Sequence, residues 1–193
     1  MIEGDLFETD VGLPEGLRYR AELLAPDEET ALVAMLEKLP FREFEFHGFF
    51  GKRRVLSFGW RYDFNGGGLQ PAEAIPAFLL PMRERAAAFA ELPASSLAHV
   101  LLTEYRPGAA IGWHKDRSVF GDVVGVSLLS AAALRLRCKS GRGWRRALLK
   151  LQPRSAYLLR GPARTRWEHS IPAVAHLRYS ITFRTLYERG TLG

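Results

Sequence analysis

The hydrophobic and polar positions predict helices in the first half of the chain. Residues 30–39 place apolar side chains at helical spacing. Pro26 and three acidic residues precede this segment and favour a first helical turn, whereas Pro40 ends the helix. A second helical pattern covers residues 71–92, which internal prolines divide into shorter pieces. We therefore expect two helical regions in this half.

The second half has a short, alternating pattern interrupted by glycine and proline, which is typical of strands joined by turns. Seven segments have this character: residues 97–105, 111–116, 123–129, 133–138, 145–151, 155–159 and 178–186. Helices followed by many strands predict an α+β fold with an antiparallel barrel or sandwich. Because no repeat or flexible linker divides the chain, we expect residues 1–193 to form a single domain.

Composition narrows the class of protein. The hydrophobic fraction of 47% and the charged fraction of 25% are ordinary for a soluble globular domain. We expect no membrane span, because no uncharged apolar run reaches about 18 residues, and no secretory signal, because the N-terminus is acidic. The single cysteine, Cys138, excludes an internal disulfide framework and a cysteine-based zinc site. We expect a cytoplasmic monomer.

The net charge of +6 is concentrated in one part of the chain. Residues 123–167 contain no Asp or Glu, whereas Lys and Arg recur throughout them. Such a stretch predicts a positive face that attracts a polyanion, with nucleic acid as the first candidate. A solvated basic surface without a ligand explains the same composition.

Two metal-binding residue types, His114 and Asp116, stand two positions apart. On an extended strand, side chains at this spacing point to the same face and can reach one point. A distant histidine such as His169 would complete the triad of two imidazoles and one carboxylate that suits non-haem Fe(II). The spacing alone also occurs by chance in many chains.

The last predicted strand alternates strictly. One face carries polar side chains: Arg178, Ser180, Thr182 and Arg184. The other face carries Tyr179, Ile181 and Phe183. Two arginines facing into a barrel are costly without anions, and each matches a carboxylate, so a dicarboxylic ligand such as 2-oxoglutarate would satisfy both. A solvent-exposed polar face is the alternative.

About 90 residues resemble the AlkB family of Fe(II)/2-oxoglutarate dioxygenases. The matching positions, in family order, are Tyr105-Arg106-Pro107-Gly108, Ile111, His114-x-Asp116, Phe120, Val126-Ser127-Leu128, Leu151, Tyr157, Gly161, Arg164, Trp167-x-His169 and Arg178-x-Ser180-x-Thr182-x-Arg184. The resemblance implies a double-stranded β-helix, or jelly roll, over residues 96–187. Residues 1–95 would form N-terminal helices and a substrate lid.

The resemblance also implies roles for individual residues. Fe(II) would be held by His114, Asp116 and His169. Arg178 and Arg184 would hold the two carboxylates of 2-oxoglutarate, with Tyr105, Thr103 and Ser180 beside them; the family usually has Asn at position 103 and often at 180.

Three other histidines are present in the chain, and one of them is an alternative third ligand. His176 shares a strand face with Arg178, but His169 has the Trp-x-His context of the family. His99 precedes an apolar strand and His47 lies among phenylalanines, so neither is assigned a role.

Residues 53–64 resemble the segment that forms the lid over the active site in AlkB-type enzymes. Trp60 and Tyr62 share one strand face and could stack on a planar substrate. Ordinary core packing is the alternative for both. Repair enzymes of the family commonly have an acidic residue two positions after the iron-binding Asp, but here Arg117 and Ser118 follow Asp116.

The resemblance implies consumption of O₂ and 2-oxoglutarate and hydroxylation of a C–H bond. We expect oxidative dealkylation of alkylated bases in DNA or RNA, with release of succinate, CO₂ and formaldehyde. An AlkB-like enzyme that acts on a protein or small molecule is the alternative. A barrel that binds without catalysis is a third hypothesis, against which the intact triad and both arginines argue.

Overall fold

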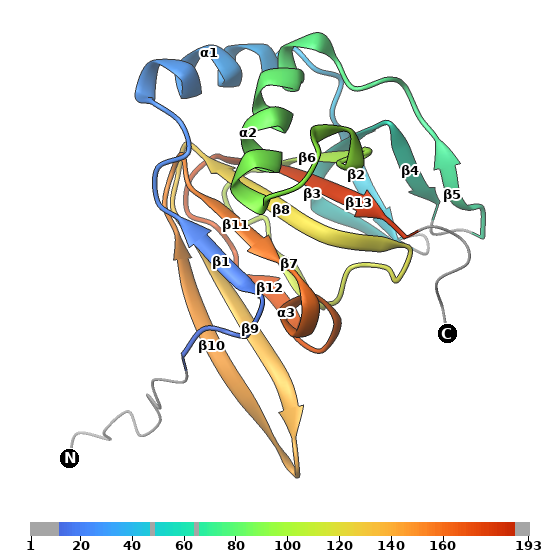
Figure 1. Cartoon of the computed structure of the whole chain (residues 1–193). Coiled ribbons are helices and arrows are strands. Elements are labelled where there is room, and N and C mark those ends of the chain that lie inside the picture. The colour runs from blue at the N-terminus through green and yellow to red at the C-terminus, as the bar shows by residue number, and fades with distance from the viewer. Residues whose placement is uncertain (1–11, 47–48, 64–65, 188–193) are drawn as a thin grey trace, which may run out of the picture.

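Two antiparallel sheets face each other in the computed structural model (Figure 1), which describes residues 12–46, 49–63 and 66–187. The major sheet has seven strands in the order β1 (Leu17–Arg20), β11 (Ala156–Leu159), β8 (Phe120–Leu128), β13 (Arg178–Leu186), β6 (His99–Tyr105), β3 (Phe49–Phe58) and β2 (Arg42–Phe46). The minor sheet has four strands in the order β10 (Gly143–Leu151), β9 (Ala132–Ser140), β12 (Glu168–Ile171) and β7 (Ile111–His114). A separate hairpin consists of β4 (Trp60–Asp63) and β5 (Gly68–Pro71).

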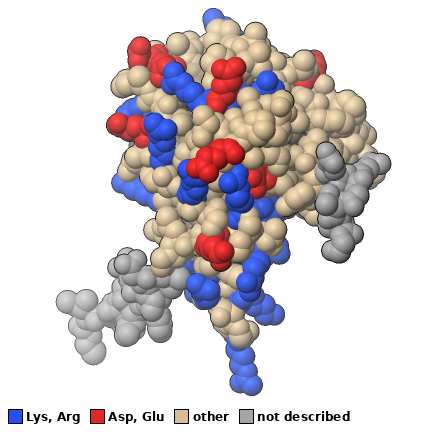
Figure 2. All heavy atoms as spheres, in the orientation of Figure 1, with Lys and Arg blue, Asp and Glu red and all other residues tan. Residues whose placement is uncertain are grey.

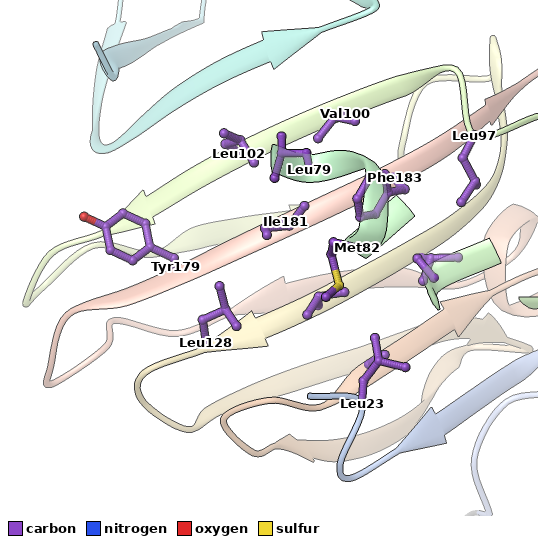
Figure 3. Packing of buried hydrophobic residues seen from close by; sticks show 14 of the residues in the cluster. Leu23, Leu79, Met82, Leu97, Val100, Leu102, Leu128, Tyr179, Ile181 and Phe183 are labelled. Atoms are coloured by element: carbon purple, nitrogen blue, oxygen red, sulfur yellow. The ribbon is translucent and has the colours of Figure 1, made fainter. Parts of the chain in front are cut away.

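Helices cover the outer face of the major sheet (Figures 1 and 3). These are α1 (Pro26–Leu36) and α2 (Leu80–Ala90), with the short 3₁₀ turns η1 (Ala77–Leu79) and η2 (Ala94–Ser96) before and after α2. Tyr179, Ile181 and Phe183 of β13 pack into this apolar layer, on the face that the alternation predicted. The polar side chains of β13 therefore point between the two sheets.

The predicted α+β fold is confirmed. All seven predicted strands are present, with boundaries shifted by a few residues, and β13 begins and ends where the alternation predicted. The first helix begins at Pro26, as expected, and ends at Leu36 rather than residue 39. Among the described residues, no helix is long and apolar enough to span a membrane.

Two parts of the prediction were wrong. Residues 72–76 are not helical, because the prolines around them restrict the backbone, and the helix begins only after η1. The first half of the chain also supplies β1 and β2 to the major sheet, and β12 and the short helix α3 (Gly161–Thr165) were not predicted. These short segments lack a strong pattern of their own and are held by neighbouring strands.

Candidate active site

A cavity of about 1340 Å³ lies between the sheets and opens beside the β4–β5 hairpin. Its lining includes nine of the residues singled out from the sequence: Thr103, Tyr105, His114, Asp116, His169, Ser180, Arg184, Tyr62 and Arg117. Trp60, Ser118 and Arg178 do not line it. The fold therefore gathers positions that are up to about 120 residues apart in the chain around one space.

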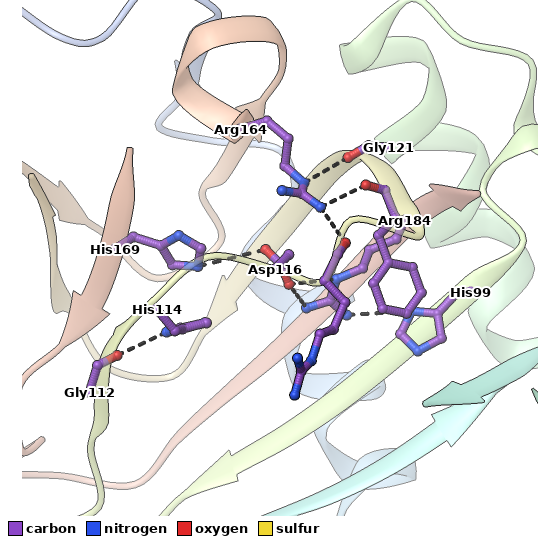
Figure 4. Close-up of polar contacts among 10 residues, drawn as sticks. His99, Gly112, His114, Asp116, Gly121, Arg164, His169 and Arg184 are labelled. Carbon is purple, nitrogen blue, oxygen red and sulfur yellow. Dashed lines mark hydrogen bonds and ion pairs between the residues drawn. The ribbon is translucent and has the colours of Figure 1, made fainter. Parts of the chain in front are cut away.

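The two histidines come from neighbouring strands of the minor sheet. His114 of β7 lies opposite His169 of β12, and their ring centroids are 4.3 Å apart. The His114 Nδ1 atom is 2.9 Å from the Gly112 carbonyl oxygen, to which it donates (Figure 4). Because the proton sits on Nδ1, the Nε2 lone pair of His114 is left free for another partner.

Burial keeps both imidazoles neutral. It lowers the pKa of His169 to about 3, with a further contribution from nearby His114. Burial likewise lowers the pKa of His114, against an opposing hydrogen bond to Gly112. Neutral imidazole is the form that binds a metal ion, so neither residue must lose a proton near pH 7.

Asp116 meets both a histidine and an arginine. Its Oδ1 accepts from Arg184 Nε at 3.0 Å and from Arg184 Nη2 at 2.7 Å (Figure 4). Its Oδ2 lies 3.7 Å from His169 Nε2 and is buried without a hydrogen-bond partner. Burial alone would raise the pKa of Asp116, but Arg184, and then His169 and His114, lower it below its ordinary value.

This donor set fits Fe(II). A buried carboxylate oxygen without a partner is costly, and a cation beside it would remove that cost. Two neutral imidazoles and one carboxylate are the ligands of the non-haem iron facial triad. The three side chains do not yet converge on one point, because Asp116 is turned toward Arg184. Among the described residues, no three His, Cys, Asp or Glu side chains enclose a metal position.

Arg164 of α3 holds the turn that follows Asp116. Its guanidinium donates to the carbonyl oxygens of Arg117 at 2.6 Å, Phe120 at 2.6 Å and Gly121 at 3.0 Å (Figure 4). Three bonds from one rigid, mostly buried group restrict the backbone of this turn. Arg164 therefore fixes the position from which Asp116 enters the cavity.

Arg178 is completely buried on β13. Its Nε donates to Ser127 Oγ at 3.0 Å, but Nη1 and Nη2 have no partner. The Tyr105 ring lies 4.9 Å from the guanidinium and separates it from the cavity that Tyr105 lines. An unpaired buried charge is costly, so this environment suits an anion such as a carboxylate.

The guanidinium of Arg184 uses only some of its N–H groups within the protein. Three of its five N–H groups are engaged, two by Asp116 and one on Nη1 beside His99 Nδ1 at 3.4 Å. One N–H remains on each terminal nitrogen, which matches the two oxygens of a carboxylate. Arg184 can thus hold Asp116 and a carboxylate ligand together.

Two cavity residues were missed as functional positions. His99 is buried on β6, packs against Phe120 with ring centroids 4.7 Å apart, and lies opposite Arg184. The signal was available, because His99 shares a strand face with Thr103 and Tyr105 at even spacing. Tyr157 of β11 also lines the cavity, and its ring occupies the space that a side chain at Gly125 would fill.

Burial raises the pKa of Tyr157 to about 12, so its hydroxyl stays protonated. A Cβ at Gly125 would lie 2.3 Å from two ring carbons of Tyr157. The sequence signal was an isolated glycine inside a strand, which often marks close approach of another group.

The remaining predicted positions are separated. Tyr62 and Arg117 meet at the cavity, with the guanidinium 5.1 Å from the ring centroid, whereas Trp60 lies opposite Pro71 in the β4–β5 hairpin. Ser118 is exposed on the turn after Asp116.

The predicted lid is also divided, because residues 53–58 belong to β3 in the major sheet. Among the described residues of this segment, Trp60–Asp63 form β4 of the separate β4–β5 hairpin, and Phe64 lies outside the described residues.

The other histidines are placed as follows. The rival third ligand His176 is exposed and does not line the cavity. His47 lies outside the described residues.

Comparison with known proteins agrees with this site. The structure is similar to OsALKBH1, with a TM-score of 0.68 and 17% identity over 90% of this chain and 100% of that chain. It is also similar to a Pseudomonas putida prolyl-4-hydroxylase, with a TM-score of 0.61 and 16% identity over 90% of this chain and 93% of that chain. No curated protein sequence matches the chain significantly.

At these identities the two structures show the fold alone, and they confirm the predicted AlkB-like jelly roll. The family model of the 2OG-Fe(II) oxygenase superfamily matches residues 16–184, which include the whole cavity and both sheets except the last two residues of β13. Its cofactors are Fe(II) and 2-oxoglutarate, used with O₂. The predicted enzyme class is confirmed, and the chain belongs to the 2OG-Fe(II) oxygenase superfamily.

Proposed function

We propose that this dioxygenase removes alkyl groups oxidatively from bases of DNA or RNA. The observation that supports a nucleic acid is the basic β9–β10 hairpin, which protrudes beyond the barrel (Figures 1 and 2). It lies within residues 123–167, which contain no Asp or Glu. Arg53, Lys115 and Arg117 add positive charge to the lining of the cavity. A polyanion would be attracted to both regions.

Fe(II) would be held by His114, Asp116 and His169. When bound, iron and 2-oxoglutarate supply with O₂ the oxidising power that hydroxylates a C–H bond of the substrate. The two neutral imidazoles need no deprotonation, and the buried Asp116 Oδ2 has no competing hydrogen bond. Gly112 orients the His114 ring through its carbonyl oxygen.

2-Oxoglutarate would be held by both arginines of β13. Arg184 would bind the carboxylate nearer the iron through its two free N–H groups while it orients Asp116. Arg178 would bind the other carboxylate through Nη1 and Nη2, which requires the Tyr105 ring to admit it. Thr103 and Ser180, which lie opposite each other on β6 and β13, line the same cavity and offer hydroxyl groups.

The substrate base would enter where Tyr62 and Arg117 meet. Their contact joins the β4–β5 hairpin to the turn after Asp116, next to the proposed metal ligands. An aromatic ring and a guanidinium both stack on planar bases. Trp60 and Ser118 do not line the cavity, so any role of theirs would concern flanking parts of a substrate.

A panel of methylated nucleobases tests this function. The iron-loaded enzyme is incubated with 2-oxoglutarate, O₂ and modified oligonucleotides of DNA and of RNA, and formaldehyde and loss of the methyl group are measured together. For at least one base, we expect one molecule of formaldehyde to be released for each methyl group lost. Asp116→Ala should abolish both signals. Its matched control is Asp122→Ala, which removes a carboxylate paired with Arg160 outside the cavity and should keep turnover.

A protein or small-molecule substrate is the second candidate. The likeness to a prolyl-4-hydroxylase shows only the fold and does not favour a peptide. Release of succinate without demethylation of any nucleobase in the panel would exclude nucleic-acid dealkylation and favour this candidate. Failure to bind 2-oxoglutarate would instead indicate a non-catalytic barrel.

A further inference from the structure

Tryptophan and arginine side chains alternate on the outer face of the minor sheet. The Arg137 guanidinium lies 4.3 Å from the Trp144 ring centroid and 4.4 Å from that of Trp113. Arg135 lies against the same Trp113 ring at 5.2 Å. We name these four residues, Trp144, Arg137, Trp113 and Arg135, the Trp–Arg ladder. It runs from β10 through β9 and across β12 to the edge strand β7.

The register of the strands explains why these residues meet. Neighbouring residues on a strand point to opposite faces, so Trp113 points outward where His114 points into the barrel. Arg137 lies opposite Glu168, which points outward because the next residue, His169, points into the barrel. The Glu168 carboxylate accepts from Arg137 Nε at 2.6 Å and fixes the guanidinium between the two rings. The ladder is therefore the reverse side of the proposed iron site.

The two ends of the ladder have different surroundings. Trp113 precedes His114 on the edge strand β7, whose residues Gly112 and His114 line the cavity. Trp144 is 42% exposed and stands at the start of β10, next to the turn of the protruding hairpin. Arg137 covers one side of its ring, so the exposed part is available to another planar group. The ladder thus extends from the cavity toward the tip of the hairpin.

The outer face of the minor sheet is positively charged and would attract a polyanion. Five Lys or Arg side chains lie on this outer face, Arg135, Arg137, Lys139, Arg146 and Lys150, together with one acidic residue, Glu168, which Arg137 already pairs. Arg146 and Lys139 are exposed on the hairpin and have no acidic partner among the described residues. Rigid aromatic rings interleaved with cations are suited to unpaired bases and their phosphates, because every base can stack on a ring. Bases of a duplex are already stacked and cannot do so.

We propose that the Trp–Arg ladder binds single-stranded nucleic acid on one side of the nucleotide in the cavity. A base stacks on the exposed ring of Trp144, and Arg146 and Lys139 contact phosphates. This proposal rests on the proposed function, because the path of the strand from the cavity to the hairpin tip assumes that the modified nucleotide lies in the cavity. Affinity for an unmodified strand, however, does not depend on demethylation.

Binding is measured with the enzyme loaded with Fe(II) and 2-oxoglutarate without oxygen, by fluorescence anisotropy of labelled single strands of DNA and of RNA. Trp144→Ala should weaken binding about tenfold, the value of one base–aromatic stack, without changing the dependence on salt. Trp144→Phe keeps a ring and should retain most of the affinity. Leu148→Ala is the matched control, because Leu148 is 64% exposed on the same strand and face but has no ring.

A second variant separates phosphate contact from stacking. Arg146→Ala should lower the slope of log affinity against log salt by about 1, as loss of one phosphate contact does. Thermal unfolding of each variant shows whether the fold is retained, and Trp144→Phe remains informative if Trp144→Ala is unstable. A labelled duplex of the same sequence should bind more weakly than the single strand.

The outcomes distinguish the ladder from the reaction. Wild-type enzyme that binds no single strand at low salt, or Trp144→Ala enzyme that binds as wild type does, would overturn the ladder even if a free modified nucleoside is demethylated. A strand affinity that depends on Trp144, together with no demethylation of any base, would retain the ladder and exclude the proposed function.

Discussion

The two sheets of this barrel differ most on their outer faces. The major sheet is covered by α1 and α2 over a continuous apolar layer, to which Leu36, Leu79 and Phe183 each contribute fully buried side chains (Figure 3). The minor sheet has no helix on its outer face among the described residues and exposes arginine, lysine and tryptophan there. The outer face of the major sheet therefore adds a packed apolar layer to the fold, while the outer face of the minor sheet is left open to ligands.

The inner faces differ as well. The minor sheet supplies His114 and His169, neutral groups that need little beyond burial to stay ready for a metal. The major sheet supplies Arg178 and Arg184, whose charges have to be balanced inside the barrel. Its helical cover holds β13 in place, so the same strand anchors the core with one face and presents two buried cations with the other.

The largest effect is expected at Asp116, where the two sheets meet. Asp116→Ala should abolish turnover, because it removes one of three proposed iron ligands. It should also lower the free energy of unfolding by about 3–5 kcal/mol, because the buried Arg184 would lose its carboxylate. Succinate release and urea denaturation measure the two effects, and persistent succinate release would contradict the assignment of Asp116.

Truncation of an apolar side chain on each outer face tests how much that face contributes to the free energy of unfolding. Phe183→Ala in the helix-covered layer should cost about 3–5 kcal/mol of unfolding free energy. Leu148→Ala on the exposed face of the minor sheet should change it by no more than about 0.5 kcal/mol. Urea denaturation of both variants is the measurement. Equal losses would mean that the minor sheet also depends on cover on its outer face.

The two buried arginines Arg178 and Arg164 should respond in opposite ways. Arg178→Met should raise the KM for 2-oxoglutarate by about 10–100-fold, since a charge-assisted contact of about 1.5–3 kcal/mol is lost. The unliganded protein should be as stable as wild type or more stable, because an unpaired buried charge is removed.

Arg164→Met should instead destabilise the fold, because three carbonyl oxygens lose their donor. Thermal unfolding without 2-oxoglutarate compares the two variants. A lower melting temperature for Arg178→Met would show that the contacts of Arg178 with Ser127 and Tyr105 stabilise the fold by more than its unpaired charge destabilises it.

The smallest effect concerns the contact between the two helices. Hydrogen bonds from Arg85 of α2 and from the Ala25 backbone lower the pKa of Glu28 from 4.5 to about 2. A lowered pKa means that the carboxylate stabilises the folded state above pH 4.5 and that this contribution is lost as pH falls toward about 2. Glu28→Gln should lack this part of the pH dependence in acid titrations followed by circular dichroism. Unchanged acid sensitivity would mean that the contact is too exposed to matter.

Alternation made the strand pairs that build the site predictable. β13 separates Arg178 and Arg184 from Tyr179 and Phe183 by period alone, and the structure keeps that division. β12 was missed because Glu168–Ile171 has little strand propensity of its own and forms only between β9 and β7. His99 was missed because the predicted strand was judged by its apolar residues, although its even spacing from Tyr105 placed it on the inner face.

The sequence by itself determined which residues share a strand face, because that depends only on a period of two along an extended chain. This period placed His114 with Asp116 and Arg178 with Arg184, whereas His169 entered only through the resemblance to the AlkB family. Only the tertiary structure decided which charges meet, because pairing across strands depends on register and on sheet order. Register and sheet order decide that Arg184 pairs with Asp116 and that the Trp–Arg ladder forms. They also decide that Nη1 and Nη2 of Arg178 are left without a partner.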